Sequence, residues 1–215
     1  MLTRSRAVVL AVAALSLGAC ANVHPGSAAV VDGESISMRT LDDTAVAYCT
    51  LTADSAKQQG IQSVDNADVR RQAIVGLVSV AVARDVAERE DLTIEPSAYE
   101  LDAQQRQSLE SAFPDGDVDA LQQAIQDSRE VSAIATALAV KQTGEQPTPE
   151  NEAQLAEMGQ NTILGAFADS DVKFAPRFGL SPSGEQRADT GSLSVASVDL
   201  EAPTAEDLPV TQRCS

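Results

Sequence analysis

Apolar residues recur at helical spacing along most of the chain, and short polar stretches separate the runs. Apolar positions three or four residues apart gather on one face of a helix, which can then pack against a core. A shorter helix is expected to begin at Pro96, because proline suits the first turn of a helix. The pattern also predicts four long helices, at about residues 38–58, 67–91, 118–143 and 150–168. The expected fold is therefore mainly α-helical.

Residues 73–83, AIVGLVSVAVA, are apolar on nearly every face of the second predicted helix. A helix of this kind is buried on most sides, and so short an apolar run cannot span a membrane. The valines would also suit a buried β-strand, which stays open as an alternative. Charged residues on both sides at helical spacing, Arg70-Arg71 and Arg84-Asp85, favour the helix.

Two short β-favouring segments surround Asp32-Gly33, a dipeptide that accepts the positive φ angles of a tight hairpin turn. Ser37 then stands where it can cap a helix that begins at Met38. Further along the chain, residues 171–174 are predicted to form another strand, which Pro176 ends. The sequence therefore predicts a small amount of β-structure at both ends of a helical body.

The first residues have the features of an export signal. Two arginines near the start are followed by an apolar run at 7–17 and then by Leu-Gly-Ala-Cys. That ending resembles the lipobox of bacterial lipoproteins, in which the cysteine carries a diacylglyceryl group after cleavage. The resemblance implies that residues 1–19 are a signal peptide, that Cys20 is lipidated and that residues 20–27 form a spacer. An ordinary signal with a chance cysteine is the alternative.

The charge balance is consistent with a covalent anchor. The chain has 15 basic and 32 acidic residues, a net charge of −17. Cleavage would remove Arg4 and Arg6 and no acid, which leaves 13 basic residues against 32 acidic ones, or −19. Such a chain is repelled by anionic headgroups and by nucleic-acid phosphates. We therefore expect acyl chains to hold the protein on the extracytoplasmic face of the cell membrane, and we expect no nucleic-acid partner.

Two cysteines remain besides Cys20, namely Cys49 and Cys214. In an exported chain an even pair is more often bridged than free. A bridge would close a loop of about 165 residues, which the chain-entropy treatment relates to roughly 4–5 kcal/mol of stability. The alternatives are two unrelated thiols, or a bond from Cys214 to a partner protein.

No catalytic centre, metal site or cofactor is predicted. His24 is the only histidine, and it belongs to the expected spacer, where it cannot easily serve a serine of the helical body as a base. A zinc site is not expected, because one histidine and two distant cysteines are too few ligands. Acid pairs such as Asp42-Asp43 are explained by solvated helix faces as well as by acid–base catalysis, and the solvated face is the favoured interpretation.

The segment DGDVD, residues 115–119, places three aspartates at the first, third and fifth positions of a calcium loop. The pattern then fails, because Ala120 replaces the glycine and Gln126 replaces the closing glutamate. Acids just before a helix also cap its free amides and suit its dipole. Capping is therefore the favoured interpretation, with calcium as the alternative.

VVDGESISMRTLDD, a long apolar helix and DLTIEPSAYELD follow one another in this chain. This order resembles the N-terminal domain of the SurA family of extracytoplasmic chaperones, and it is similar to lipoprotein foldases of the PrsA type. The resemblance implies a helical domain over residues 28–180. It also implies a small antiparallel β clasp, in which residues near 29–36 pair with residues near 171–174. Residues 181–215 are then a tail, which their polar composition predicts to be flexible and which a disulfide would tether.

One departure from the family limits what the resemblance implies. Members with peptidyl-prolyl isomerase activity carry an inserted parvulin-type domain before the final helix, whereas here only residues 144–149 occupy that junction. The resemblance therefore implies a non-catalytic lipoprotein that holds unfolded or exported polypeptides in an apolar crevice between helices. The alternative is an accessory envelope lipoprotein that docks one fixed protein partner. A hydrolase is the least supported class.

Overall fold

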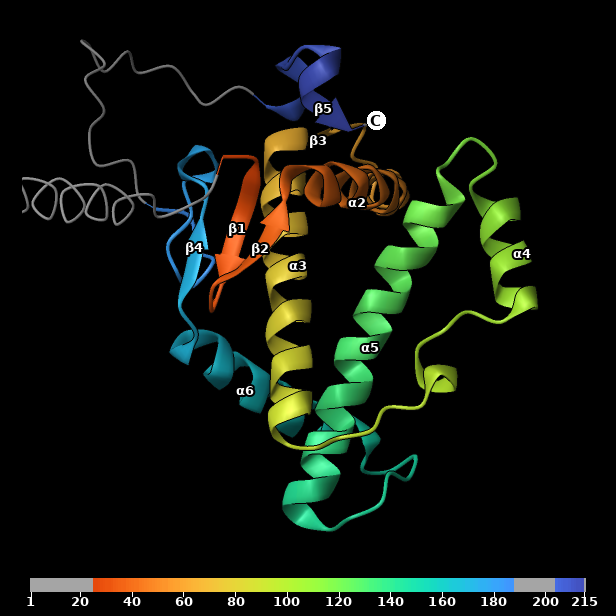
Figure 1. The fold of residues 1–215 in the computed structure, drawn as a ribbon. Coiled ribbons are helices and arrows are strands. Elements are labelled where there is room, and N and C mark those ends of the chain that lie inside the picture. Colours follow the sequence, from red (N-terminus) through yellow and green to blue (C-terminus); the bar gives the residue numbers. More distant parts are fainter. Residues whose placement is uncertain (1–24, 188–203, 215) are drawn as a thin grey trace, which may run out of the picture.

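A computed structural model describes residues 25–187 and 204–214. It is mainly α-helical with a small antiparallel sheet (Figure 1), which confirms the predicted fold class. Cys20 and His24 lie outside the described residues. The α-helices of the described part are α2 (Met38–Gln58), α3 (Asn66–Arg89), α4 (Ala103–Ala112), α5 (Val118–Thr143) and α6 (Glu152–Asp169).

The three-stranded sheet joins the two ends of the helical body. β1 (Ser27–Val31) lies between β2 (Glu34–Ser37) and β4 (Val172–Phe174), and it pairs antiparallel with both. Figure 1 shows these strands beside α3, with β4 reached directly from the end of α6. The predicted clasp between residues near 29–36 and residues near 171–174 is therefore present.

The hairpin turn between β1 and β2 also holds the start of β4. Asp32 and Gly33 have φ angles of 49° and 91°, as a two-residue turn of type I′ requires. The backbone N–H of Asp32 donates to the carbonyl oxygen of Asp171 at 3.2 Å. In return, Asp32 Oδ1 accepts from the N–H of Asp171 at 2.9 Å. Asp32 therefore reverses the chain and also connects the hairpin to the residue that precedes β4.

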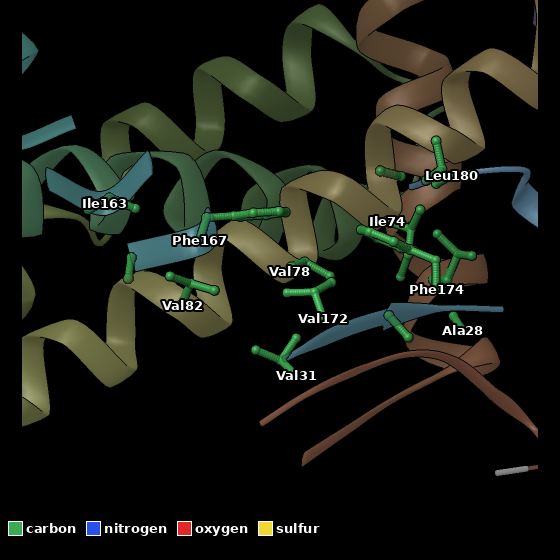
Figure 2. Close-up of a cluster of buried hydrophobic side chains, with 14 of the residues drawn as sticks. Ala28, Val31, Ile74, Val78, Val82, Ile163, Phe167, Val172, Phe174 and Leu180 are labelled. Carbon is green, nitrogen blue, oxygen red and sulfur yellow. The ribbon is translucent and has the colours of Figure 1, made fainter. Parts of the chain in front are cut away.

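α3 runs through the centre of the body (Figure 1) and packs against α2, α5, α6 and β1. Residues 73–83 are helical, so the alternative of a buried strand is wrong. Figure 2 shows Ile74, Val78 and Val82 of this helix in one cluster with Val172 of the sheet. Neighbours on several sides explain why the helix is apolar nearly all round.

α5 and α6 approach one another so closely that backbone lies against backbone. A Cβ atom added at Gly159 of α6 would lie 1.7 Å from the carbonyl oxygen of Ala135 on α5. That separation is far inside van der Waals contact, so only glycine fits at this crossing. α6 also contributes Ile163 and Phe167 to the core (Figure 2).

The prediction of a helix that begins at Pro96 is wrong. Pro96–Ala98 forms a single 3₁₀ turn (η1), and α4 begins only at Ala103. Asp102 and Gln105 form a reciprocal capping box, in which each side chain accepts from the other residue's backbone N–H. The backbone N–H groups of Asp102 and Gln105 both have hydrogen-bond acceptors in this arrangement. The capping box therefore stabilises a helix that starts after Asp102 more than proline alone stabilises one that starts at Pro96.

Parts of the predicted C-terminal tail pack against the body. Leu180 and Gln186 form a β-bridge, and β5 (Arg213–Cys214) pairs antiparallel with β3 (Val64–Asp65). The rest of the predicted tail, residues 188–203 and Ser215, lies outside the described residues. Three further 3₁₀ turns of the described part are η2 (Pro176–Phe178), η3 (Ala205–Asp207) and η4 (Val210–Gln212).

Candidate functional site

An open groove of about 850 Å³ lies between α5 and the segment 90–98 that follows α3. We name it the α5 groove. Its volume is in the range of clefts that bind ligands in proteins. Most of its lining is apolar and comes from the segment (Leu92, Ile94, Ala98), from α5 (Ala133, Ala137, Val140) and from the connection to α6 (Pro147).

The α5 groove exists because the chain turns sharply at the end of α3. Asp91 takes a left-handed φ of 50°, and the N–H of Leu92 donates to the carbonyl oxygen of Ala87 at 2.9 Å. Leu92 and Ile94 then pack partly against the core. Figure 1 shows the chain continuing past the lower half of α5 and away from it towards α4. The segment therefore forms one wall of the groove and α5 the other.

Lys141 holds the segment to α5. Its Nζ donates to the carbonyl oxygen of Glu90 at 2.5 Å and to Glu90 Oε2 at 2.9 Å. The hydrogen bond from Lys141, and then its charge, lower the pKa of the Glu90 carboxyl group. Three more acids of the groove, Asp91, Glu95 and Glu152, are exposed. The rim of an apolar groove is thus net acidic.

A smaller cavity of about 170 Å³ lies where α2, α3 and α5 meet, and we name it the Tyr48 pocket. A Cβ atom added at Gly76 of α3 would lie 2.4 Å from the hydroxyl oxygen of Tyr48 on α2. Glycine therefore makes room for the phenol between the helices. The polar residues that line the pocket are Thr44, Tyr48, Ser79, Asp127, Ser128 and Gln160.

Asp127 of the Tyr48 pocket belongs to an ion cluster with Arg84 and Glu130. Arg84 Nη2 lies 2.6 Å from Glu130 Oε2 and 3.1 Å from Asp127 Oδ1. Burial raises the pKa of Asp127, although hydrogen bonds from Gln123 and Arg84 act in the opposite direction. Burial, and then the charge of Asp127, raise the pKa of Tyr48. The pocket therefore combines a neutral phenol with a carboxyl group that has lost much of its water.

The structure places Cys49 and Cys214 at disulfide distance, with their Cα atoms 5.4 Å apart. This separation is typical of bridged cysteines. Cys214 is only 1 % exposed and packs with Ala53 and Val69. The two cysteines that the sequence analysis paired are therefore neighbours, whereas lipidation of Cys20 stays a prediction because that residue lies outside the described part.

The aspartates of the segment 115–119 act in helix capping and ion pairing. Asp117 Oδ1 accepts from the N–H of Ala120 at 3.1 Å and so caps α5. Asp119 Oδ1 lies 2.8 Å from Arg106 Nη2. The capping interpretation is confirmed for Asp117. Within residues 25–187 and 204–214, no group of three or more His, Cys, Asp or Glu side chains is arranged to hold a metal ion.

The residues of the α5 groove and of the Tyr48 pocket were not predicted from the sequence. The α5 groove depends on where the segment 90–98 passes the helix, and Tyr48 and Asp127 are far apart in the chain and carry no shared motif. One local signal was available, since a glycine inside an apolar helix such as Gly76 often marks a close approach of another group. The signal does not say which group approaches.

No protein-family model, curated protein or solved structure matches this chain. The likeness to SurA-type domains therefore rests on the order of sequence elements described above. In the part of the chain that the structure describes, every helix is too short or too polar to cross a membrane.

Proposed function

We propose that the protein is a lipoprotein, anchored through Cys20 on the extracytoplasmic face of the cell membrane, that binds unfolded or exported polypeptides without catalysis. The observation that carries the proposal is the α5 groove, which is apolar and open to solvent. The resemblance to the SurA N-terminal domain supports the same function from the sequence. Binding is expected to need only burial of apolar side chains in the groove.

The lining of the α5 groove suits an extended polypeptide. Ala133 and Ala137 lie about one turn apart on α5 and leave space above the helix, while Leu92 and Ile94 form the facing wall. Apolar side chains that enter the groove are stabilised by about 25 cal/mol per Å² of area removed from water. Ordering of the bound segment offsets part of that gain. The expected binding is therefore weak and exchangeable.

The connection between α5 and α6 supports a function without isomerase chemistry. Gly144 ends α5 in a left-handed conformation with φ 75°. Asn151 Oδ1 accepts from the N–H of Thr148 at 2.7 Å and keeps the connection compact. Pro147 of the same connection lines the α5 groove. The junction that carries a parvulin-type domain in isomerase members of the SurA family thus contributes to the proposed binding surface here.

A second function is favoured by one feature of the groove. Its apolar lining comes from a single α-helix, α5, and from connecting segments. A groove of this kind can also seat one fixed protein, as in an accessory envelope lipoprotein. The two functions differ in the number of partners, which an experiment can count.

Ala137→Gln tests the α5 groove. The larger polar side chain would occupy apolar space in the groove, so we expect a several-fold loss of protection of unfolded proteins against aggregation. Light scattering with several unrelated clients measures the protection. Ser132→Gln makes a similar change at an exposed position of the same helix, and it should leave protection unchanged.

The possible outcomes separate the two functions. Protection of several clients by the wild-type protein, lost in Ala137→Gln, supports a general binder of unfolded chains. Protection of none, together with stable capture of one envelope protein, favours the accessory function. Equal protection by Ala137→Gln and the wild type would place client binding outside the α5 groove.

A further inference from the structure

The ion cluster beside the Tyr48 pocket contains more negative than positive charge. The guanidinium group of Arg84 forms salt bridges with the carboxylates of both Asp127 and Glu130. Arg84 makes three contacts with Glu130 and one with Asp127. Asp127 Oδ1 receives that contact and a second one from Gln123, whereas Oδ2 accepts no hydrogen bond from the described residues. One oxygen of Asp127 is therefore available to a ligand.

Asp127 has only limited contact with bulk water. Its side chain is only 14 % exposed, and burial is the main cause of its raised pKa. A carboxylate that has lost water without gaining a full set of partners costs free energy. A cation in the adjoining pocket would supply the missing interaction, and an anion there would be repelled.

The Tyr48 pocket also has the shape and lining for an organic cation. Its volume of about 170 Å³ has room for several water-sized groups. Thr44, Tyr48 and Ser128, which carry hydroxyl groups, line it together with Asp127. Hydroxyl and carboxylate oxygens can accept the three hydrogen bonds that an ammonium group donates from its single nitrogen. The apolar side chains of the lining are Leu77, Val80, Ala124 and Val131, and Gly76, Ser79 and Gln160 complete it.

We propose that the Tyr48 pocket binds a primary alkylammonium group, with the charged end at Asp127 and Tyr48 and the alkyl chain against the apolar wall. A lysine side chain of a bound polypeptide and a free small amine share this chemistry. A metal ion fits less well, because Asp127 is the one carboxylate among the described residues that line the pocket, and metal sites of this kind need several charged oxygens. The site goes beyond the proposed function, because it is separate from the α5 groove.

An NMR titration of the isotope-labelled, full-length protein with n-butylammonium chloride tests the proposal. We expect saturable shifts around Tyr48, Gly76 and Asp127, and no such shifts with n-butanol, the uncharged analogue. Asp127→Asn should weaken binding by about tenfold or more, the effect of losing a hydrogen bond to a charged group. Asp43→Asn removes the same charge from an exposed position of α2, and it should leave binding unchanged.

Tyr48→Phe keeps the ring and removes the hydroxyl, so it serves as a second variant if Asp127→Asn does not fold. It should weaken n-butylammonium binding several-fold. Equal shifts with n-butanol, or equal affinities of Asp127→Asn and the wild type, would overturn the proposal. Competition by a lysine peptide but not by its norleucine counterpart would support the site and assign it to polypeptide side chains. Competition by free amines alone would support a site for small amines.

Discussion

At the residue scale, two glycines allow close approaches between helices. Gly159 lets the backbone of α6 reach Ala135 on α5, and Gly76 lets the hydroxyl of Tyr48 reach α3. Glycine inside a helix costs roughly 0.5–1 kcal/mol relative to alanine, because the unfolded chain loses more freedom. At these two positions the loss is offset by packing that a larger residue would prevent.

Gly159→Ala should destabilise the protein. The new Cβ atom would lie 1.7 Å from the carbonyl oxygen of Ala135, so α6 would have to move away from α5. Overpacking of this kind costs about 1–3 kcal/mol, which urea unfolding measures. Gly165→Ala is the matched control, because its Cβ would meet nothing within 4 Å and should stabilise the helix by about 0.5–1 kcal/mol. Equal effects of the two substitutions would contradict the close crossing.

Asp127 should make the stability of the protein depend on pH. Burial raises its pKa in the folded state, so the folded protein favours the protonated carboxyl group. The stabilising contribution is therefore full below the pKa of the unfolded chain and is lost as the pH rises through the folded-state pKa. Asp127→Asn resembles the protonated form but does not titrate.

The melting temperature of Asp127→Asn, relative to that of the wild type, should consequently increase from about pH 3.5 to about pH 7. Calorimetry of both proteins across this range measures the difference. Asp43→Asn, at an exposed position of α2, controls for the change in net charge. A difference between Asp127→Asn and the wild type that does not vary with pH would contradict the raised pKa of Asp127.

At the scale of elements, the C-terminal segment is attached by a short strand and a cysteine pair. β5 pairs with β3 over two residues only, and Arg213 Nη1 donates to the carbonyl oxygen of Glu206 at 2.8 Å within the segment. So short a ladder has little stability of its own. The bond between Cys49 and Cys214 should therefore provide most of the attachment.

Cys49→Ser should lower the melting temperature under oxidising conditions, because the bridge closes a loop that spans 165 positions of the sequence. The chain-entropy treatment gives an upper effect of roughly 4–5 kcal/mol for a loop of this length. In the presence of a reductant, the variant and the wild type should melt at similar temperatures. If reductant leaves the melting temperature of the wild type unchanged, the bridge does not contribute to stability.

At the scale of the whole molecule, the net charge and the expected anchor act in opposite directions. The expected mature chain carries 13 basic and 32 acidic residues, so an anionic membrane surface repels it. Two acyl chains are enough to hold such a body at the membrane, where one is marginal. The protein should therefore depend on Cys20 for its location.

Cys20→Ala should release the protein from membranes without unfolding it, because the helical body begins several residues later. Fractionation after a salt wash measures the location, and circular dichroism measures the fold. Cys49→Ser is the matched control, since it also removes a cysteine but leaves the expected anchor in place. Continued membrane attachment of Cys20→Ala after the wash would defeat the anchor assignment.

The sequence by itself determined the elements whose causes are local. Helices at about 38–58, 67–91 and 118–143 follow from apolar spacing, and the hairpin follows from the φ angles that Asp32-Gly33 accepts. The β clasp was also predicted, from the resemblance to the SurA family, and the cysteine pair from the even count in a chain that is expected to be exported. Neighbouring residues carry the signals for the helices and the hairpin, and a simple count carries the signal for the cysteine pair, whereas the clasp followed from the resemblance alone.

Only the tertiary structure decided where the groove and the pocket lie, whereas the start of α4 had a local cause, the capping-box spacing of Asp102 and Gln105, that the prediction at Pro96 overlooked. The reciprocal hydrogen bonds of Asp102 and Gln105 determine the start of α4. The α5 groove and the Tyr48 pocket depend on helix spacing of a few ångströms, which packing between residues far apart in the chain determines. Hydrophobic periodicity shows which face of a helix is buried, but not how closely another helix approaches that face.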